Sequence, residues 1–184
     1  MDEIEAGFSL LVERVKDMDQ KTGELRTEII RQDGALLGRM AAIAAPVVKK
    51  IGLALLRQGK QDPRGELYDA TFYDQKMIVL GKTDPVPHRP DNPGKAVTDQ
   101  FCVLSENGMF YELMYSTDGF IVDSYLNAIS SEEAIGLYTH EVILMLYRAL
   151  RDYLSEQEDL LAALEKTLAF IQEKTAAPGN TGRA

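Results

Sequence analysis

The sequence contains no tryptophan, one cysteine and two histidines among its 184 residues. With only Cys102, no disulfide can form within the chain, which is typical of proteins from a reducing compartment. Cysteine and histidine pairs at the spacing of zinc ligands are missing, so the sequence indicates no zinc site of that kind. The absence of tryptophan weakens the case for base stacking or sugar binding, although eight tyrosines remain.

Several common catalytic motifs are also missing. The chain has no GxxxxGK[ST] phosphate loop, no GxGxxG after a strand and no GxSxG nucleophile elbow. No apolar run is long and charge-free enough to span a bilayer, and the acidic start MDEIEAG lacks the basic and apolar regions of a signal peptide. We therefore expect a cytoplasmic protein. The sequence does not identify a cofactor, and it carries the diagnostic motifs of no known family.

The composition is that of an acidic globular protein, with 45% hydrophobic residues, 27% charged residues and a net charge of −9. This length and apolar content predict one compact domain over residues 1–174. Residues 175–184 contain Pro178, Gly179 and Gly182, and we expect a disordered tail there. A negative field over the whole molecule argues against general binding to nucleic acid.

Three runs rich in β-branched and aromatic residues between 100 and 126 predict an antiparallel meander. The runs are separated by Asn107-Gly108 and by Asp118-Gly119. Each dipeptide suits a two-residue type I′ hairpin turn, in which both central residues need a positive φ. Two such signals in succession make this stretch the clearest structural feature of the sequence.

The register set by these turns decides which residues share a face of the sheet. The first turn pairs Cys102 with Leu113, and the second pairs Leu113 with Ser124. This face is largely apolar and should meet the helices. The opposite face is too apolar for a solvated surface and too polar for a dry core, which indicates a dimer contact or a ligand surface. Its members are Phe101, Val103, Ser105, Phe110, Glu112, Met114, Ser116, Ile121, Asp123 and Tyr125.

An acidic pair on this mixed face is the best candidate for chemistry. Glu112 and Asp123 become diagonal neighbours, about 7–8 Å apart at Cβ. Two such carboxylates can divide acid and base roles or hold a divalent cation; solvated carboxylates separated by the strand twist are the alternative. His88, in a loop rich in proline, is a third catalytic candidate, and an exposed connector histidine is its alternative.

Residues 67–82 contain two strand-like runs, LYDATFY and KMIVLGK, which are separated by Asp74-Gln75 and predict a hairpin. Four prolines between residues 83 and 96 then exclude a regular helix or a central strand. A loop of this length is usually functional or disordered. The residues of this loop and of the sheet that we expect to contact a ligand or partner are Arg89, Phe110, Met114 and Tyr125.

Both ends of the chain carry apolar residues at alternating steps of four and three, the spacing of a coiled-coil seam. In the N-terminal helix, expected to end near Gln32-Asp33-Gly34, the seam comprises Ile4, Phe8, Leu11, Val15, Met18, Thr22, Leu25 and Ile29. In the C-terminal helix, which starts at a capping box of Ser130 and Glu133, it comprises Ile143, Tyr147, Leu150, Leu154, Gln157, Leu161, Leu164, Leu168 and Ile171. We expect the two helices to pair, within one chain or between two, and packing on the domain is the alternative.

Residues 35–57 predict a second N-terminal helix, kinked or restarted at Pro46. Unlike the rest of the chain, the stretch from 35 to 64 is basic, with six bases against one acid. These bases can offset acids elsewhere in the fold. They can also bind a small anion or a nucleic-acid backbone, with Lys49 and Lys50 as the candidate contacts. A third interpretation is an amphipathic helix on anionic lipid, although its apolar face lacks Trp and Phe.

Together these patterns predict an α+β fold. Two N-terminal helices precede an antiparallel sheet of about five strands, made of a hairpin and a three-strand meander, and a long C-terminal helix pairs with the N-terminal helix. The functional prediction is a non-enzymatic binding or assembly module, a homodimer that holds a protein partner or small ligand. The alternatives are a small enzyme that uses Glu112, Asp123 and His88, and a peripheral membrane protein docked through residues 35–57.

Overall fold

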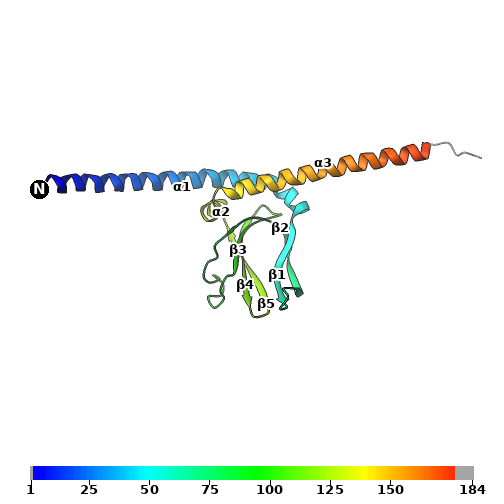
Figure 1. The fold of residues 1–184 in the computed structure, drawn as a ribbon, viewed down its shortest axis with the longest axis horizontal. Coiled ribbons are helices and arrows are strands. Elements are labelled where there is room, and N and C mark those ends of the chain that lie inside the picture. The colour runs from blue at the N-terminus through cyan, green and yellow to red at the C-terminus, as the bar shows by residue number, and fades with distance from the viewer. Residues whose placement is uncertain (1, 177–184) are drawn as a thin grey trace, which may run out of the picture. The chain divides into compact units, whose positions relative to one another are not determined.

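The computed structural model describes residues 2–176 and has the predicted α+β fold with a long C-terminal helix (Figure 1). The chain divides into two compact units, residues 1–145 and 146–184, with the boundary inside that helix. The single domain expected over residues 1–174 stays a prediction. The elements are α1 (Glu3–Ile51), β1 (Leu53–Gln61), β2 (Leu67–Thr83), β3 (Asp99–Ser105), β4 (Phe110–Asp118), β5 (Ile121–Ile129), α2 (Ser131–Tyr138) and α3 (Glu141–Ala176).

α1 is one continuous helix, so the prediction of two N-terminal helices is wrong. It starts after Asp2, the N-cap residue, and runs without interruption through Gln32-Asp33-Gly34, where an end was expected. Pro46 also lies inside the helix. Both Pro46 and Ala42 are exposed, so water can bond to the Ala42 carbonyl that loses its usual amide donor.

Gly34 serves helix packing rather than helix termination. A Cβ atom at this position would lie 2.6 Å from Cγ and 2.8 Å from Cα of Glu132 in α2. The missing side chain therefore lets the two helices approach closely. The buried residues of α1 begin at Gly34, and they define the barrel-facing side of the helix. They are Gly34, Leu37, Ala41, Ala44 and Val48.

The helix ends at Gly52, and the residues beyond it form β1, where the sequence predicts helix to residue 57. A Cβ atom on Gly52 would lie 2.6 Å from the Val48 carbonyl oxygen and 3.0 Å from the Met77 amide nitrogen. Glycine thus allows the close approach between the end of α1 and strand β2. The Gly52 amide donates to the same Val48 carbonyl at 2.7 Å, which closes the helix.

The five antiparallel strands close into a barrel in the order β1-β2-β3-β4-β5, and β5 pairs back onto β1. The number of strands agrees with the prediction, but the first hairpin does not. β2 runs straight through Asp74-Gln75, where a turn was expected, and its hairpin partner is β1. Register shifts between β1 and β2 mark bulges, which add the twist and bend that closure of a small barrel requires.

An apolar cluster with members from every strand fills the barrel interior. Its buried centre consists of Met77, Val103 and Leu113. The Tyr73 and Ser124 hydroxyls share a hydrogen bond of 3.0 Å, which joins β2 to β5. Packed around the centre are the partly buried side chains of Leu55, Tyr73, Phe101, Tyr111, Tyr115 and Leu126.

The turn between β3 and β4 contains three residues rather than two, and this shifts the strand register by one. The Ser105 amide donates to the Met109 carbonyl at 2.9 Å, and Gly108 takes a φ of +76°. A one-residue shift turns a strand over. Phe101 and Val103 consequently belong to the interior cluster instead of the mixed face on which the sequence places them.

The turn between β4 and β5 also differs from the prediction. Its loop is Gly119-Phe120, with Gly119 at a φ of +60°, and Asp118 pairs directly with Ile121. Glycine at the first loop position suits a type II′ turn. The register therefore moves by two residues, which keeps each β5 residue on its predicted face but gives it different neighbours.

The expected C-terminal helix is divided into two. The capping box of Ser130 and Glu133 is confirmed and opens α2. Thr139 then takes a φ of +65°, which ends α2 before α3 begins. The next residue, His140, places Nδ1 3.0 Å from a carboxylate oxygen of Asp33, and this contact ties the α2–α3 junction to α1. The predicted disordered tail, beyond Ala176, lies outside the described residues.

We predict opposite effects for alanine at two glycines of α1. G34A should lower the free energy of unfolding by about 1–3 kcal/mol, because its methyl group would press on the Glu132 backbone. G23A, with nothing within 4 Å, should leave it unchanged or raise it by up to about 1 kcal/mol, because alanine favours helix. Urea unfolding followed by circular dichroism measures both. A more stable G34A variant would contradict the close packing of α1 on α2.

Candidate functional site

The three catalytic candidates do not form one site. Glu112 pairs with Asn127, whereas Asp123 pairs with Ser116, four residues further along β4. At about 3.3 Å per residue this separates the two carboxylates by roughly 13 Å along the sheet. His88 lies in the loop between β2 and β3 with its side chain exposed. The predicted diagonal pair is therefore wrong, because it depended on a register that the β4–β5 turn does not have.

Glu112 belongs to a buried polar network that joins three strands. Its two carboxylate oxygens accept hydrogen bonds from Gln100 Nε2 at 2.7 Å and from Asn127 Nδ2 at 3.1 Å. The Gln100 side-chain oxygen in turn accepts from the Val86 amide at 2.9 Å. The Tyr138 hydroxyl of α2 is buried nearby, and its burial, together with the Glu112 charge, raises the pKa of Tyr138. Each carboxylate oxygen thus has a structural partner, and the network holds the proline-rich loop against the sheet.

Arg89 anchors the same loop at a second point. Its Nε and one terminal nitrogen donate to the Asp91 carboxylate at 2.9 and 2.5 Å, and these bonds lower the pKa of Asp91. Its other terminal nitrogen lies 3.0 Å from Asp123, out of hydrogen-bond alignment. The guanidinium also lies 5.7 Å from the Tyr125 ring centroid, and Lys95 contacts Asp123. The predicted residues Arg89, Asp123 and Tyr125 therefore meet, but in a closed cluster whose charges are already paired.

A small hollow of about 250 Å³ lies beside this cluster. The Ser116 hydroxyl on its wall is buried without a hydrogen-bond partner, and the Lys95 ammonium points to Asp123. The hollow therefore offers no uncommitted cation to a ligand. Its lining residues are Gly94, Lys95, Ala96, Ser116, Thr117 and Asp118.

The remaining sheet candidates are covered by the chain itself. Phe110 and Met114 are 4% and 2% exposed, so they cannot form the open partner surface that the sequence predicts. The proline-rich loop, through Arg89 and Val86, covers another part of the same face. The mixed character of this face is therefore explained by contacts within the chain.

The basic segment, residues 35–57, does not form the lipid-docking helix that was one interpretation of the sequence. Lys49 and Lys50 are exposed in the last turn of α1, where positive charge is favourable to the helix dipole. The apolar side of this part of α1, which includes Leu37 and Val48, is buried within its own domain. An amphipathic helix over residues 35–57 is therefore not present to dock on lipid. Among the described helices, none is both long enough and apolar enough to cross a membrane.

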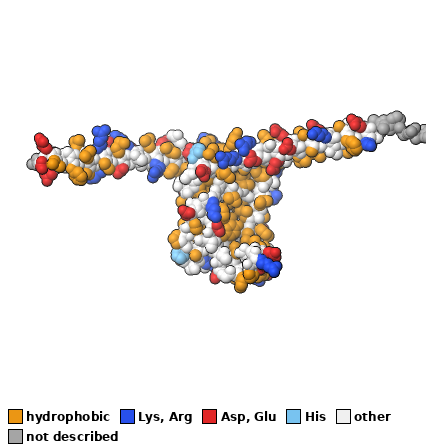
Figure 2. All heavy atoms as spheres, in the orientation of Figure 1, with side chains coloured by type: hydrophobic (Ala, Val, Ile, Leu, Met, Phe, Trp, Pro, Cys, Tyr) orange, Lys and Arg blue, Asp and Glu red, His pale blue; other side chains and the backbone are white. Residues whose placement is uncertain are grey.

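In the N-terminal part of α1, the apolar residues that the sequence predicts as a coiled-coil seam are exposed. We call this set the α1 seam. Figure 2 shows hydrophobic side chains recurring along α1 among charged ones. The apolar members of the seam are between 57% and 77% exposed, and they are Ile4, Phe8, Leu11, Val15, Met18, Leu25 and Ile29, with Thr22 as the polar member.

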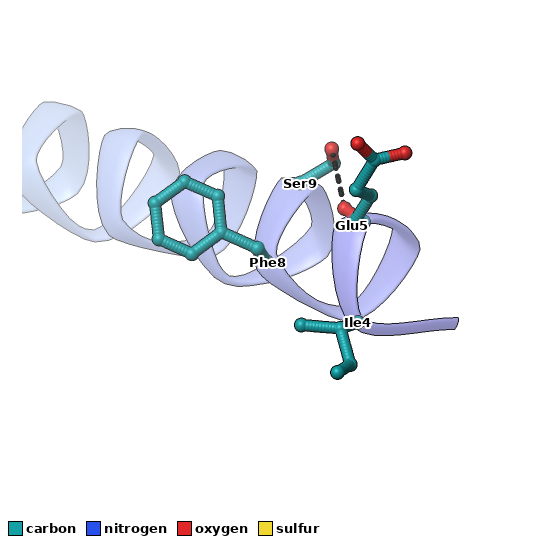
Figure 3. A pocket seen from close by; sticks show the side chains of 4 residues that line it. All are labelled: Ile4, Glu5, Phe8 and Ser9. Atoms are coloured by element: carbon teal, nitrogen blue, oxygen red, sulfur yellow. Dashed lines mark hydrogen bonds between the residues drawn. The ribbon is translucent and has the colours of Figure 1, made fainter. Parts of the chain in front are cut away.

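Surface hollows on this part of α1 are shallow and belong to the helix alone. One is lined by Ile4, Glu5, Phe8 and Ser9 (Figure 3). Ile4 and Phe8 project from the helix, while Ser9 donates a hydrogen bond of 2.9 Å to the Glu5 carbonyl. Such a hollow has no opposite wall, so it is suited to another helix rather than to an enclosed small molecule.

The α1 seam lies on a different side of the helix from the barrel. In heptad notation, seam residues occupy positions a and d, with Phe8 and Val15 at a and Leu11 at d. The barrel-facing side of α1, from Gly34 to Val48, falls at positions b and f of the same repeat. At 100° per residue the centre of the seam is about 90° from the centre of the barrel-facing side. The helix can therefore bind its own barrel and still leave the seam uncovered.

The seam also extends further than the sequence pattern predicts. Leu36 and Ile43 follow Ile29 at steps of seven, and both are exposed, Ile43 by 80%. They were missed because the helix was expected to end near residue 34. The steps of seven contained a signal, but the d positions between these residues are Gln32 and Arg39, so the alternating pattern of four and three stops at Ile29.

The second unit also carries a row of exposed apolar residues, on α3. The seam residues Leu154, Leu161, Leu164 and Leu168 of α3 are 56–58% exposed. The pairing of the terminal helices, within or between chains, stays a prediction, because the α1 seam and these four α3 leucines are exposed in the part of the chain that the structure describes.

Neither a group of metal ligands nor a similar protein points to another functional site. Among residues 2–176 no three His, Cys, Asp or Glu side chains are grouped to hold a metal ion. No family model, curated protein or solved structure matches the chain. The α1 seam is thus the candidate functional site on its geometry alone.

We predict that E112Q lowers the free energy of unfolding by about 1–3 kcal/mol. The new amide group would face the Gln100 or Asn127 donors, so at least one buried hydrogen bond would be lost. Urea denaturation measures the change, with D118N at the exposed end of β4 as the control. Equal stability of E112Q and the unsubstituted protein would contradict the network.

We predict that Cys102 is unreactive in the folded protein. The side chain is fully buried, and burial raises the pKa of its thiol to about 12, so almost no thiolate exists at pH 8. A colorimetric thiol reagent should react only after a denaturant is added. Rapid reaction under native conditions would contradict the assigned position of Cys102 on β3.

Proposed function

We propose that this protein is a non-enzymatic assembly module that forms a homodimer through the α1 seam. The observation that carries the proposal is the apolar set at coiled-coil spacing, more than half exposed and on a different side of the helix from the barrel. Apolar surface of this extent and regularity is a mark of an interaction site. The two barrels would then be rigid bodies held by the paired helices.

The energetic argument favours burial of the seam. Full burial of a Leu, Ile, Val, Phe or Met side chain is favourable by roughly 1.5–3 kcal/mol. A micromolar complex requires about 8 kcal/mol in total. Even partial burial of the apolar seam residues on two chains exceeds this value, which leaves a margin for the entropy lost on association.

A second copy of the chain is the partner that the seam fits. From Ile4 to Ile29 the seam spans roughly 38 Å of helix, enough for three to four heptads of coiled coil. β-Branched residues at position a with Leu at position d favour two-stranded pairing. Val15, Thr22 and Ile29 occupy a, and Leu11 and Leu25 occupy d. The exposed stripe of α3 supplies a second apolar surface for the same assembly.

The geometry gives no support to the enzymatic alternative. Glu112 has both oxygens engaged in the core, and Asp123 contacts Arg89 and Lys95. His88 is exposed in a loop. We keep the cytoplasm as the proposed compartment, because the chain has a single, buried cysteine.

The proposal predicts that L11Q weakens dimerisation at least tenfold. Each dimer would lose two buried leucines at the seam, and each such loss costs about 1.5–3 kcal/mol. L10Q is the matched control, because Leu10 is equally exposed but lies at position c, outside the seam. Analytical ultracentrifugation or light scattering over a range of concentrations measures both variants.

The two alternative outcomes are distinct. A concentration-independent monomer for the unsubstituted protein would refute the homodimer. Equal weakening by L10Q and L11Q would show that general apolar exposure, not the seam, drives association.

A further inference from the structure

We propose that the α3 helices of four chains form a four-helix bundle, so that two of the dimers proposed above join into a tetramer. This proposal rests on the homodimer through the α1 seam. It adds a second interface and the partner that fits it, which is α3 of further copies of this chain. Three features of α3 carry it: the exposure of its outer part, the width of its apolar face and the residues at its a positions.

The outer part of α3 carries apolar side chains that nothing in its own unit covers. Every residue from 154 to 174 is exposed. Five leucines in this range, which are between 51% and 58% exposed, make up what we call the α3 stripe: Leu154, Leu160, Leu161, Leu164 and Leu168. Most helices in proteins are stabilised mainly by the packing of an apolar face. The regular exposure of these leucines therefore indicates that they pack on other helices in the assembled protein.

The α3 stripe is wider than a coiled-coil seam. Its three rows are represented by Leu161 at position a, Leu164 at position d and Leu160 at position g. Together these positions span about 120° of the helix surface. The neighbouring g positions are Tyr153 and Thr167, so no charge interrupts this flank of the stripe between residues 153 and 167.

The α1 seam is narrower, because its g side is charged. Its g positions from residue 14 onward are Arg14, Lys21 and Glu28. An apolar face of positions a and d alone is typical of a coiled-coil seam, whereas a face that also includes g is typical of a helix that faces the core of a bundle. In a four-helix bundle each helix packs on two neighbours, which is the arrangement that the three rows of α3 require.

The residues at position a distinguish the two helices in the same way. β-Branched residues at a, such as Val15 and Ile29 of α1, favour two strands. Leucine at a with isoleucine at d shifts the preference to three or four strands. Every a position of the α3 stripe is leucine, and Ile171 occupies the d position after Leu168. The stripe is thus suited to more than one partner helix.

Four chains satisfy both interfaces. The α1 seam joins chains in pairs, so a closed assembly that uses it contains an even number of chains. The α3 stripe requires more than two helices. A tetramer is the smallest assembly that meets both conditions, and tetramers built from two-fold pairs are common among closed oligomers.

Sedimentation equilibrium of the full chain tests the bundle. The unsubstituted protein should have the mass of a tetramer that dissociates into dimers on dilution. L161Q places an amide in the middle of the stripe four times per tetramer, and it should weaken the association of dimers by roughly tenfold or more. L137Q is the matched control, because Leu137 is also an exposed leucine, at 49%, but lies in α2. This variant should associate as the unsubstituted protein does.

Q157L gives a second test with the opposite sign. Gln157 is the polar residue at position d within the stripe, and a polar residue at such a position specifies partner number at a cost in stability. In the bundle Q157L removes this cost and should strengthen the association of dimers roughly tenfold. S155L is the control, because Ser155 is exposed at position b, on the side of α3 opposite the stripe. An unchanged tetramer–dimer equilibrium in Q157L would contradict the bundle.

The outcomes separate this proposal from the homodimer itself. A dimer at every concentration, or a tetramer that L161Q and L137Q affect equally, would overturn the bundle and leave the homodimer in place. The double variant L11Q/L161Q should be a monomer under conditions in which L161Q is a dimer, because both interfaces are then lost. A monomer for the unsubstituted protein or for L161Q alone would refute both proposals.

Discussion

α1 carries apolar residues on two sides whose centres are about 90° apart around the helix, and the rest of the structure depends on this division. The barrel-facing side begins at Gly34, where the absence of a side chain lets α2 approach the helix backbone. The seam side begins at Ile4 and has no cover in the single chain. Because one rigid helix holds both sides, any partner of the seam is coupled to the barrel without contacting it. This arrangement is what an assembly module needs, and it requires no catalytic group.

The sheet shows how a small difference in turn geometry redirects a functional prediction. The β3–β4 turn has three residues instead of two, and β3 is turned over as a result. Phe101 and Val103 enter the barrel, and the face expected to be open receives a loop and helices instead. Glu112 and Asp123, which looked like a pair of reactive carboxylates, become separate structural groups with their own partners. The apparent active site was a consequence of the assumed register.

The helices show the same limit in another form. Gly34 and Gly52 both follow apolar helical sequence, and a local pattern alone favours either as a helix end. Their neighbours in space decide the matter: Glu132 lies against Gly34 and Met77 against Gly52. Pro46 is accepted within the helix because it lies on an exposed side. None of these neighbours is close in the chain, so no local propensity identifies them.

The sequence by itself determined the features that depend on spacing along the chain: the strand-rich middle, the Ser130 capping box, the two heptad seams and the α+β class. Periodicity is a local property, and a helix or strand transmits it directly to one face. Tertiary structure alone decided the closure of the barrel, the strand registers, the helix end at Gly52 and the contact of Arg89 with Asp123. These depend on which distant residues meet, and that is settled by the packing of the whole domain rather than by any one segment.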